Sequence, residues 1–431
     1  MRRRAPLVLA FVLVTVLAAS VVTATAQSNG ADTTTTTGAP TTGAPTTGAP
    51  TTSAPASGAA GTHGVTATSI TVGGLGYSSL YGGADIGAKA RFQRANDAGG
   101  VNGRTIDYLG LTDDGGDPNL GIQGATKLVQ QDHVFAVVPT ITPDLGAAKY
   151  LAQQKVPYFG WALSSNFCGN EYGFGFTGCL IPKDVASNAW GTLVTEVFGR
   201  PGRTAAIVTE NTPSGQYQLA SLTAGAKSAK LDVVYGKSAL TVPAMADFGA
   251  VAKAILTSNG GKAPESIFVV GNISNVLGLQ QALRAAGFGF GVLTNQLEYG
   301  PNLVAPSVGS FVMVQTAPTE SAATNPAVAQ MIADVQKVAP GTPITQAVTA
   351  GYWSADLFLA AVEKAGKNLT PQSLLKAANT KFTYKVANTV GPTIFPAAHS
   401  KPTPCGALVT SNGTAYSVKV PYTCGAVVPV K

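Results

Sequence analysis

Short apolar runs alternate with segments of helical periodicity from about residue 64 onward. Ser69–Leu75 is rich in β-branched and small apolar residues and predicts a buried strand. After a polar loop, apolar residues recur at helical spacing over Ala84–Ala98, and Thr105–Leu111 predicts a second strand. This order is a βαβ unit, and its loop follows the carboxyl end of a strand, where α/β sheets place ligands.

The alternation continues and predicts two series of strands and helices, in an α/β fold with doubly wound, mostly parallel sheets. The later strands are expected at His133–Pro139, Val156–Trp161, Thr204–Thr209, Leu231–Tyr235, Ser266–Gly271 and Phe311–Gln315.

Four other segments carry weaker or different patterns. We expect an irregular loop over Asn166–Gly178, a long helix over Val185–Phe198 and another helix over Thr349–Ala365. From Val390 onward the tail is expected to be rich in β-strands and turns.

The first 64 residues differ in composition from the rest. Residues 1–26 combine Arg2–Arg4, an apolar run and small residues before Gln27, which predicts a secretory signal cleaved after Ala26. An uncleaved membrane anchor is the alternative. Residues 27–64 repeat TTGAP and predict a disordered linker of Thr, Pro, Gly and Ala. No cysteine lies near the cleavage site for lipid attachment, so we expect a secreted or surface-associated protein.

The composition indicates a large, weakly charged protein of two domains. Hydrophobic residues make up 45% of the chain and charged residues 11%. Without the three signal arginines, the formal charge of +7 falls to +4, and the basic residues are scattered. No nucleic-acid partner is therefore expected.

The four cysteines fall into two local pairs. In an exported chain this favours the disulfides Cys168–Cys179 and Cys405–Cys424. A zinc site is the alternative, but the three histidines lack the spacing to the cysteines that zinc sites show.

Motifs for catalysis, cofactors and metals are missing from the sequence. It contains no G-x-S-x-G, H-E-x-x-H or Walker A motif. Gly74 and Gly76 follow a strand, but the third glycine of a dinucleotide motif is missing. Asp113, Asp114 and Asp117 lack the spacing of an EF-hand. We predict no enzyme activity, no cofactor and no metal.

The segment ITVGGLGYSSLYGGADIGAKARFQRANDAGGVNGRTIDYLGLTDDGGDP resembles the opening of the Leu/Ile/Val-binding family of type I periplasmic binding proteins. The features that match are the strand, the small polar loop, the N-x-x-G-G-[IV]-x-G-R helix end and the D-D-x-x-D-P strand end. The resemblance extends to the C-terminus and implies two lobes joined by a three-crossover hinge. It implies crossings near Leu180, Ala317 and Val390, so that lobe 1 comprises 65–180 and 317–390 and lobe 2 comprises 181–316 and 391–431.

The resemblance also implies a set of ligand-binding positions. In the first lobe, Tyr81 would cover an apolar face of the ligand and Thr142 would hold a carboxylate. Ala162 would offer a backbone carbonyl, and Ser164 a backbone N–H and a hydroxyl. In the second lobe the corresponding residues are Ser214, Asn272, Gln296 and Glu298.

Glu298 or Gln296 stands where the family places the acidic partner of a ligand's ammonium group. If Glu298 points into the cleft, an α-amino acid fits, because a buried charge needs a partner. If it points elsewhere, a neutral or purely anionic solute fits better.

The expected function is that of an extracytoplasmic, monomeric solute-binding protein of an ABC transporter. It would close on a small polar solute, an amino acid or amide-like compound, and deliver it to a permease. A sensor of the same fold that signals to a partner is the alternative.

Overall fold

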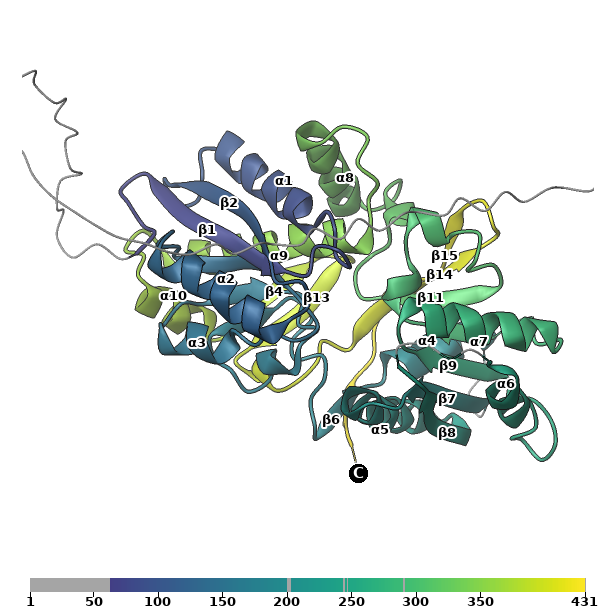
Figure 1. Cartoon of the computed structure of the whole chain (residues 1–431). Helices are drawn as coiled ribbons and strands as arrows, with labels where there is room; N and C mark the ends of the chain where they lie inside the picture. The colour runs from purple at the N-terminus through teal and green to yellow at the C-terminus, as the bar shows by residue number, and fades with distance from the viewer. Residues whose placement is uncertain (1–62, 200–202, 243–244, 246, 290, 431) are drawn as a thin grey trace, which may run out of the picture. The chain divides into compact units, whose positions relative to one another are not determined.

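The computed structural model describes residues 63–199, 203–242, 245, 247–289 and 291–430 (Figure 1). The expected signal peptide, 1–26, and all of the linker 27–64 except its last two residues lie outside this range. Within the described residues, no helix has the length and apolar character needed to span a bilayer.

The first lobe is built on a sheet of five parallel strands in the order β2-β1-β3-β4-β5. The strands are β1 (Ser69–Gly76), β2 (Thr105–Asp113), β3 (Ala136–Ile141), β4 (Tyr158–Gly160) and β5 (Gly173–Gly175).

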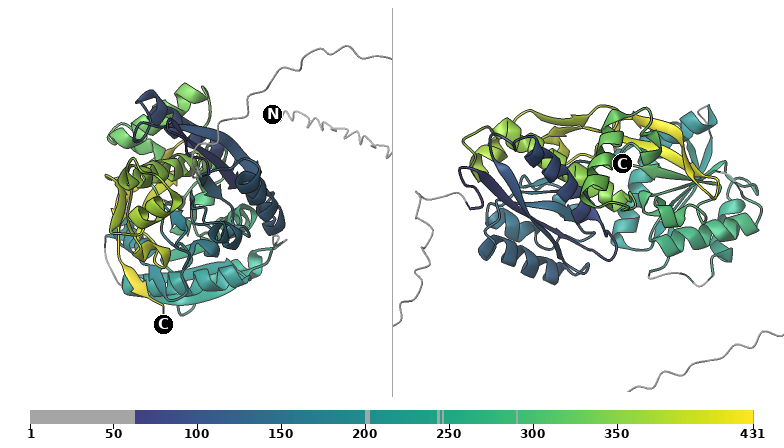
Figure 2. Two further views of the ribbon diagram at one scale, coloured as in Figure 1. Left: turned by 90° about the vertical axis from the view of Figure 1, so that its left-hand side faces the viewer. Right: turned by 90° about the horizontal axis from the view of Figure 1, so that it is seen from above.

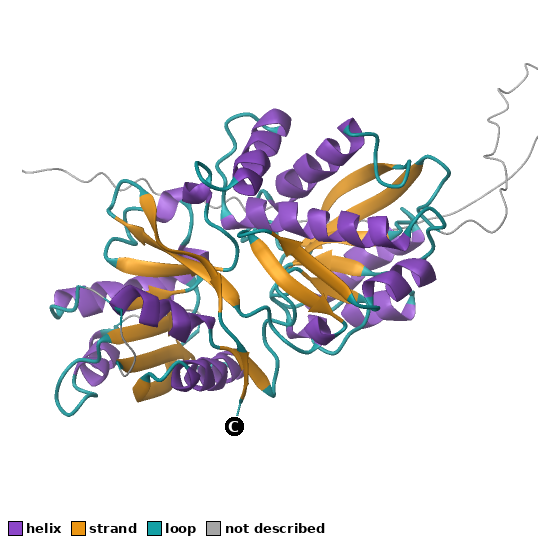
Figure 3. Ribbon diagram, turned by 180° about the vertical axis from the view of Figure 1, so that it is seen from behind, coloured by secondary structure: helices purple, strands orange, loops and turns teal. Residues whose placement is uncertain are grey.

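Helices cover both faces of this sheet (Figure 3). On one face lie α1 (Ala84–Asp97), α8 (Pro326–Val338), α9 (Gln346–Ala365) and α10 (Pro371–Ala378). On the other lie α2 (Pro118–Gln130) and α3 (Ala148–Gln153).

Glycines allow α1 and α9 to cross closely. A Cβ added at Gly87 would lie 1.9 Å from the carbonyl oxygen of Val348, and one at Gly351 would lie 1.9 Å from that of Ala84. The absence of side chains at Gly87 and Gly351 therefore lets α9, which is buried along most of its length, pack against α1.

The second lobe is built on seven strands in the order β15-β14-β11-β10-β9-β7-β8. β7 to β11 run parallel, and β14 and β15 add an antiparallel edge. The strands are β7 (Thr204–Glu210), β8 (Asp232–Leu240), β9 (Ser266–Val270), β10 (Val292–Thr294), β11 (Ser310–Val314), β14 (Cys405–Ser411) and β15 (Tyr416–Cys424). Figure 2 shows these C-terminal strands, in yellow, beside the green elements of this lobe.

Helices again cover both faces. α4 (Ala189–Phe198) and α5 (Pro213–Ser228) pack on one face, and α6 (Gly249–Leu256) and α7 (Ile273–Ala285) on the other. The short 3₁₀ helices of the chain are η1 (Ser165–Phe167), η2 (Gln296–Glu298), η3 (Pro301–Leu303), η4 (Thr319–Ser321) and η5 (Ala397–His399). The expected α/β fold with doubly wound sheets is confirmed.

Two local expectations differ from the structure. Val185–Ser187, expected to begin a helix, forms strand β6, because it pairs with β16 (Val427–Pro429) at the far end of the chain. The helix starts only at Ala189. The expected irregular loop contains β5, which pairs in parallel with β4.

Three segments connect the lobes, and hydrogen bonds join them to one another and to lobe 1. The first lies between β5 and β6, the second between β11 and α8, and the third between η5 and β14. The amide of Cys179 donates to the oxygen of Ala398 (2.8 Å), and that of Thr403 to Thr177 (2.7 Å). In the second segment, the amide of Ala317 donates to Thr389 (2.9 Å).

The resemblance implied a third crossing near Val390, but in the structure this crossing lies later in the chain, between η5 and β14. β12 (Phe382–Val386) pairs with β13 (Val390–Phe395), and residues from both strands pack in the core of the first lobe. His399 also binds this lobe, through the oxygen of Gly173 and the side chain of Asn379. We therefore propose that lobe 1 extends through His399.

Both expected disulfides are present, Cys168–Cys179 and Cys405–Cys424. The first closes a loop beside the first crossing, and the second ties β14 to β15 just after the third crossing.

Candidate functional site

A pocket of about 290 Å³ lies between the two lobes, at the carboxyl ends of strands from both sheets. None of the described residues that line it carries a charge. The apolar ones are Tyr81, Pro143, Leu163, Leu180, Ile181, Pro182, Ala186, Trp190, Leu222, Val270, Leu297, Met313 and Pro402. The polar ones are Ser187, Ser214, Gln218, Ser221, Asn295, Gln296 and Gln315.

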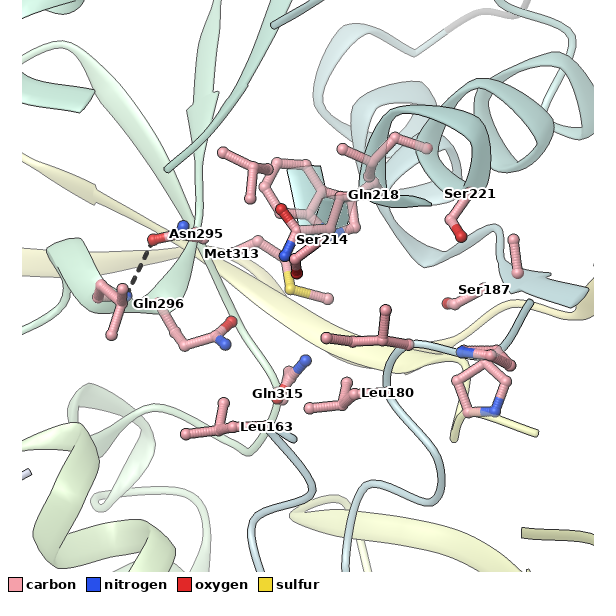
Figure 4. Close-up of a pocket in the computed structure, with 18 of the residues that line it drawn as sticks. Leu163, Leu180, Ser187, Ser214, Gln218, Ser221, Asn295, Gln296, Met313 and Gln315 are labelled. Atoms are coloured by element: carbon pink, nitrogen blue, oxygen red, sulfur yellow. Dashed lines mark hydrogen bonds between the residues drawn. The ribbon is translucent and has the colours of Figure 1, made fainter. Parts of the chain in front are cut away.

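All three crossing segments contribute to the pocket. Leu180–Pro182 belongs to the first, Gln315 to the second and Pro402 to the third. Figure 4 shows Leu180 and Gln315 reaching toward the side chains of the second lobe. A solute in this pocket would therefore touch all three segments that connect the lobes.

One wall is a row of uncharged polar side chains on α5. Ser214, Gln218 and Ser221 are spaced by four and three residues and so share one helix face (Figure 4). The row is about 10 Å long at 1.5 Å per residue. The helix starts here because Thr212 accepts a hydrogen bond from the amide of Gly215 (3.0 Å) and proline occupies the first turn.

On the first-lobe side, Tyr81 packs against Trp161 edge to face, with ring centroids 6.0 Å apart. The indole Nε1 of Trp161 donates to Oε1 of Gln315 in the second crossing segment (2.7 Å). Burial raises the pKa of Tyr81 to about 12, so its phenol stays neutral at physiological pH.

The η2 turn forms another wall. The side chain of Asn295 accepts from the amide of Leu297 (3.2 Å) and donates to the oxygen of Gly271 (3.1 Å), which fixes the turn after β10. Gln296 and Leu297 line the pocket and also a neighbouring hollow of about 260 Å³, which Tyr81 borders as well.

Glu298 does not reach the pocket. It is fully buried inside the second lobe, where its carboxyl accepts from Nε2 of Gln280 (2.7 and 2.8 Å) and from the hydroxyl of Thr294. Burial raises the pKa of Glu298 above its usual range, against the opposing effect of these hydrogen bonds. This position and environment do not fit the role of an ammonium anchor.

After β3 and β4, the residues that line the pocket are not the expected ones but their immediate neighbours in the sequence. Pro143 and Leu163 line the pocket, whereas Thr142 is buried beside the carboxyl of Asp114. Ala162 is buried in the core. Ser164 caps η1 by accepting from the amide of Asn166 (3.2 Å), and its hydroxyl also accepts from the amide of Leu145 (3.1 Å).

Asn272 has a capping role. Its side-chain oxygen accepts from the amide of Asn275 (3.0 Å) at the start of α7, and its nitrogen donates to Glu210 (2.6 Å). Of the eight expected ligand-binding residues, the structure thus brings Tyr81, Ser214 and Gln296 to the pocket. Their contact with a solute stays a prediction.

Several lining residues were missed from the sequence. Gln218 and Ser221 could have been found, because they lie at helical spacing from Ser214. Gln315 ends an expected strand, which is a usual place for a ligand contact. Trp190 and Leu180–Pro182 carry no local signal, since only the meeting of the lobes brings them to the pocket.

The site shows no sign of a metal centre. Among the described residues, no three His, Cys, Asp or Glu side chains are grouped so that they could hold a metal ion. Two α/β lobes, three crossings and a pocket between the lobes whose described lining carries no charge define a two-lobed binding protein.

Comparison with known families agrees with this class. Residues 69–415 match the family model described as periplasmic binding protein, and the chain belongs to this family. The family consists of substrate-binding proteins of the ABC transporter type and implies an extracytoplasmic location. The comparison with curated proteins gave no match.

Solved structures share the fold at low sequence identity. A fatty acid ABC transporter substrate-binding protein from Thermomonospora curvata has 19% identity and a TM-score of 0.64, with 84% of this chain and 94% of that chain covered. A solute-binding protein from Rhodopseudomonas palustris in complex with 3,4-dihydroxybenzoic acid has 18% identity and a TM-score of 0.64, with 83% and 98% covered. A branched-chain amino acid transporter substrate-binding protein from Streptococcus pneumoniae in complex with isoleucine has 17% identity and a TM-score of 0.59, with 83% and 100% covered.

Proposed function

We propose that this protein captures a small, uncharged, amide-like solute between its lobes and delivers it to an ABC permease. Residues 1–26 would direct export, and the protein would act as a monomer. The observation that carries the choice of solute is the absence of charge among the described residues that line the pocket.

The pocket favours an amide-like solute over an amino acid. An ammonium or carboxylate group that leaves water needs a partner of opposite charge or several hydrogen bonds, and otherwise costs several kcal/mol. Glu298, the expected partner of an ammonium group, is turned into the second lobe. Serine, asparagine and glutamine side chains instead match the donors and acceptors of amides, carbonyls and hydroxyls.

The apolar lining supports a solute with one polar edge. Trp190, Met313 and Leu180 face the pocket together with the polar row of α5. Such pockets bind by burial of apolar surface and take their specificity from a few polar groups. The similar structures carry fatty acid, 3,4-dihydroxybenzoic acid and isoleucine in their titles, and the apolar bodies of these compounds support the proposal of a partly apolar solute.

A thermal-shift panel tests the solute class. Three carbon skeletons, those of leucine, phenylalanine and tyrosine, would each be offered as the amino acid, the deaminated acid and the deaminated amide. We expect the largest shifts from amides. Ligand at a hundred times its Kd stabilises by about 2.7 kcal/mol, which is roughly 3 to 4 °C for about 370 folded residues that unfold together. Larger shifts from the amino acids would contradict an uncharged solute, and silence across the panel would contradict solute binding of this class.

Delivery needs a separate test. The protein would be added, with and without the amide that shifts it most, to proteoliposomes that contain a candidate ABC permease from the same organism. Solute-loaded protein should raise the ATPase rate above that of the solute-free protein. An unchanged rate would argue against delivery and favour the sensor alternative.

A further inference from the structure

The side-chain amide of Gln315 has a defined orientation. Its oxygen accepts from the indole Nε1 of Trp161 at 2.7 Å. An indole N–H only donates, so a rotated amide would place two donors against each other. Oε1 is therefore held toward Trp161 and Nε2 is turned away from it.

The nitrogen of Gln315 faces the interior of the pocket (Figure 4). Among the residues that the structure describes, the only hydrogen bond of the Gln315 side chain is the one that Oε1 accepts from Trp161, and the apolar Leu180 lies beside Gln315 (Figure 4). A solute that enters must displace water from this nitrogen. If the solute offers no acceptor there, the buried donor is left unsatisfied, at a cost that weakens binding.

Trp161 is well placed to hold this orientation. It is 1% exposed, and Tyr81 packs against its ring. Trp161 belongs to the first lobe and Gln315 to the second crossing, so their hydrogen bond also spans the hinge. The amide is preorganised in this arrangement, which lowers the entropy cost of using it for recognition.

We propose that Gln315 is a specificity-determining residue that donates its Nε2 hydrogens to an acceptor oxygen of the solute, with Trp161 as its positioning residue. This inference rests on the proposed function and refines it: the solute carries a carbonyl or similar acceptor at the hinge end of the pocket. A cationic group is rejected there, because it would meet a fixed donor.

Two probes of equal skeleton test the inference by calorimetric titration. 4-Phenylbutan-2-one has a carbonyl acceptor and no donor, and 3-phenylpropylammonium only donates. We expect the wild type to bind the ketone and not the ammonium ion. Gln315→Leu should weaken ketone binding about tenfold to a hundredfold. Gln130→Leu, an exposed glutamine at the end of α2, is the matched control and should bind like the wild type.

Two further variants separate recognition from folding. Gln315→Glu keeps the size of the side chain and the acceptor for Trp161, but presents oxygen to the pocket. It should lose the ketone and gain the ammonium ion. Trp161→Phe should weaken ketone binding severalfold in the wild type and have no further effect in Gln315→Leu, because the positioned amide is then already gone.

The outcomes distinguish this inference from the proposed function. Equal ketone affinity in the wild type and Gln315→Leu would overturn the role of Gln315 and leave the solute-binding function intact. Binding of 3-phenylpropanamide without binding of the ketone would also overturn it, because the solute's donor would then matter more than its acceptor. If neither the ketone nor any amide of the thermal-shift panel binds the wild type, the proposed function fails and this inference fails with it.

Discussion

Glu298 offers a test of whether a buried carboxyl supports the pocket or contacts the solute. Replacing it with glutamine keeps an acceptor for Gln280 and a polar group for Thr294, whose hydroxyl can also accept. Replacing it with alanine leaves both donors without an acceptor. We expect Glu298→Gln to preserve folding and solute binding, and Glu298→Ala to destabilise the second lobe.

The expected destabilisation follows from the hydrogen bonds that are lost. Each buried donor that loses its acceptor costs about 1 to 3 kcal/mol. The loss for Gln280 and Thr294 together is then about 2 to 4 kcal/mol, with partial relaxation of the site. For a unit of 150 to 250 residues this lowers the melting temperature by roughly 5 to 15 °C.

The dependence of stability on pH gives a second signature. Burial raises the folded-state pKa of Glu298 above its usual 4.5. Between 4.5 and the folded-state pKa, the native protein therefore holds more protons than the unfolded chain. The stability from this carboxyl is complete below pH 4.5 and decreases as pH rises through the folded-state pKa. Glu298→Gln should lack this decrease.

Urea unfolding from pH 4 to pH 8, combined with titration of the best amide from the thermal-shift panel, would measure both effects. The reasoning would be refuted if Glu298→Gln unfolded like the wild type but lost solute affinity. The carboxylate would then contact the solute, and an ammonium-bearing ligand would again fit the pocket.

Three further predictions concern the rest of the fold. Replacing both Cys168 and Cys179, which lie 11 residues apart, with serine should lower the free energy of unfolding by about 2.8 kcal/mol, from the loop-closure entropy of the unfolded chain. Urea unfolding measures this loss, and an unchanged midpoint would contradict it. Gly351→Ala should lower the melting temperature strongly, because its Cβ would lie 1.9 Å from the carbonyl oxygen of Ala84. The control Gly289→Ala, whose Cβ would have no atom within 4 Å, should melt like the wild type. Equal melting temperatures of the two variants would contradict the tight crossing of α1 and α9. Burial lowers the pKa of His399 from 6.5 to about 4, so the stability that neutral His399 gives the folded protein should be lost as pH falls from 6.5 toward 4. Thermal melts of His399→Gln should show a smaller drop in melting temperature over this range. An equal drop in the variant and the wild type would exclude His399 as its cause.

Much of the fold could be predicted from the sequence because it depends on local periodicity. β1, α1 and β2 have apolar residues at strand and helix spacing, and the structure shows them close to the expected bounds. The expected helix Thr349–Ala365 corresponds to α9, which begins three residues earlier, after Thr345 caps its first turn. The cysteines pair as expected because each pair lies close in the sequence.

The site was less predictable, because lining a pocket depends on the direction of a side chain. Glu298 and Gln296 lie two residues apart in one turn, yet one points into the second lobe and the other lines the pocket. After β4, Leu163 lines the pocket, whereas the next residue, Ser164, caps η1. Neighbouring residues of this loop therefore point to different sides. Neither side-chain direction could be predicted from the composition or the spacing of residues.

The sequence by itself determined that the chain forms two series of α/β units and that its cysteines pair locally, and it predicted that the residues lining a pocket follow the carboxyl ends of strands. Only the tertiary structure decided that Val185–Ser187 is a strand, because its partner lies more than 200 residues away at Val427–Pro429. It also decided which of the described residues line the pocket, none of them charged, since Leu180, Gln315 and Pro402 come from three separate crossings. Local periodicity is set by neighbours in the chain, whereas the chemistry of this pocket is set by segments that meet only when both lobes have folded.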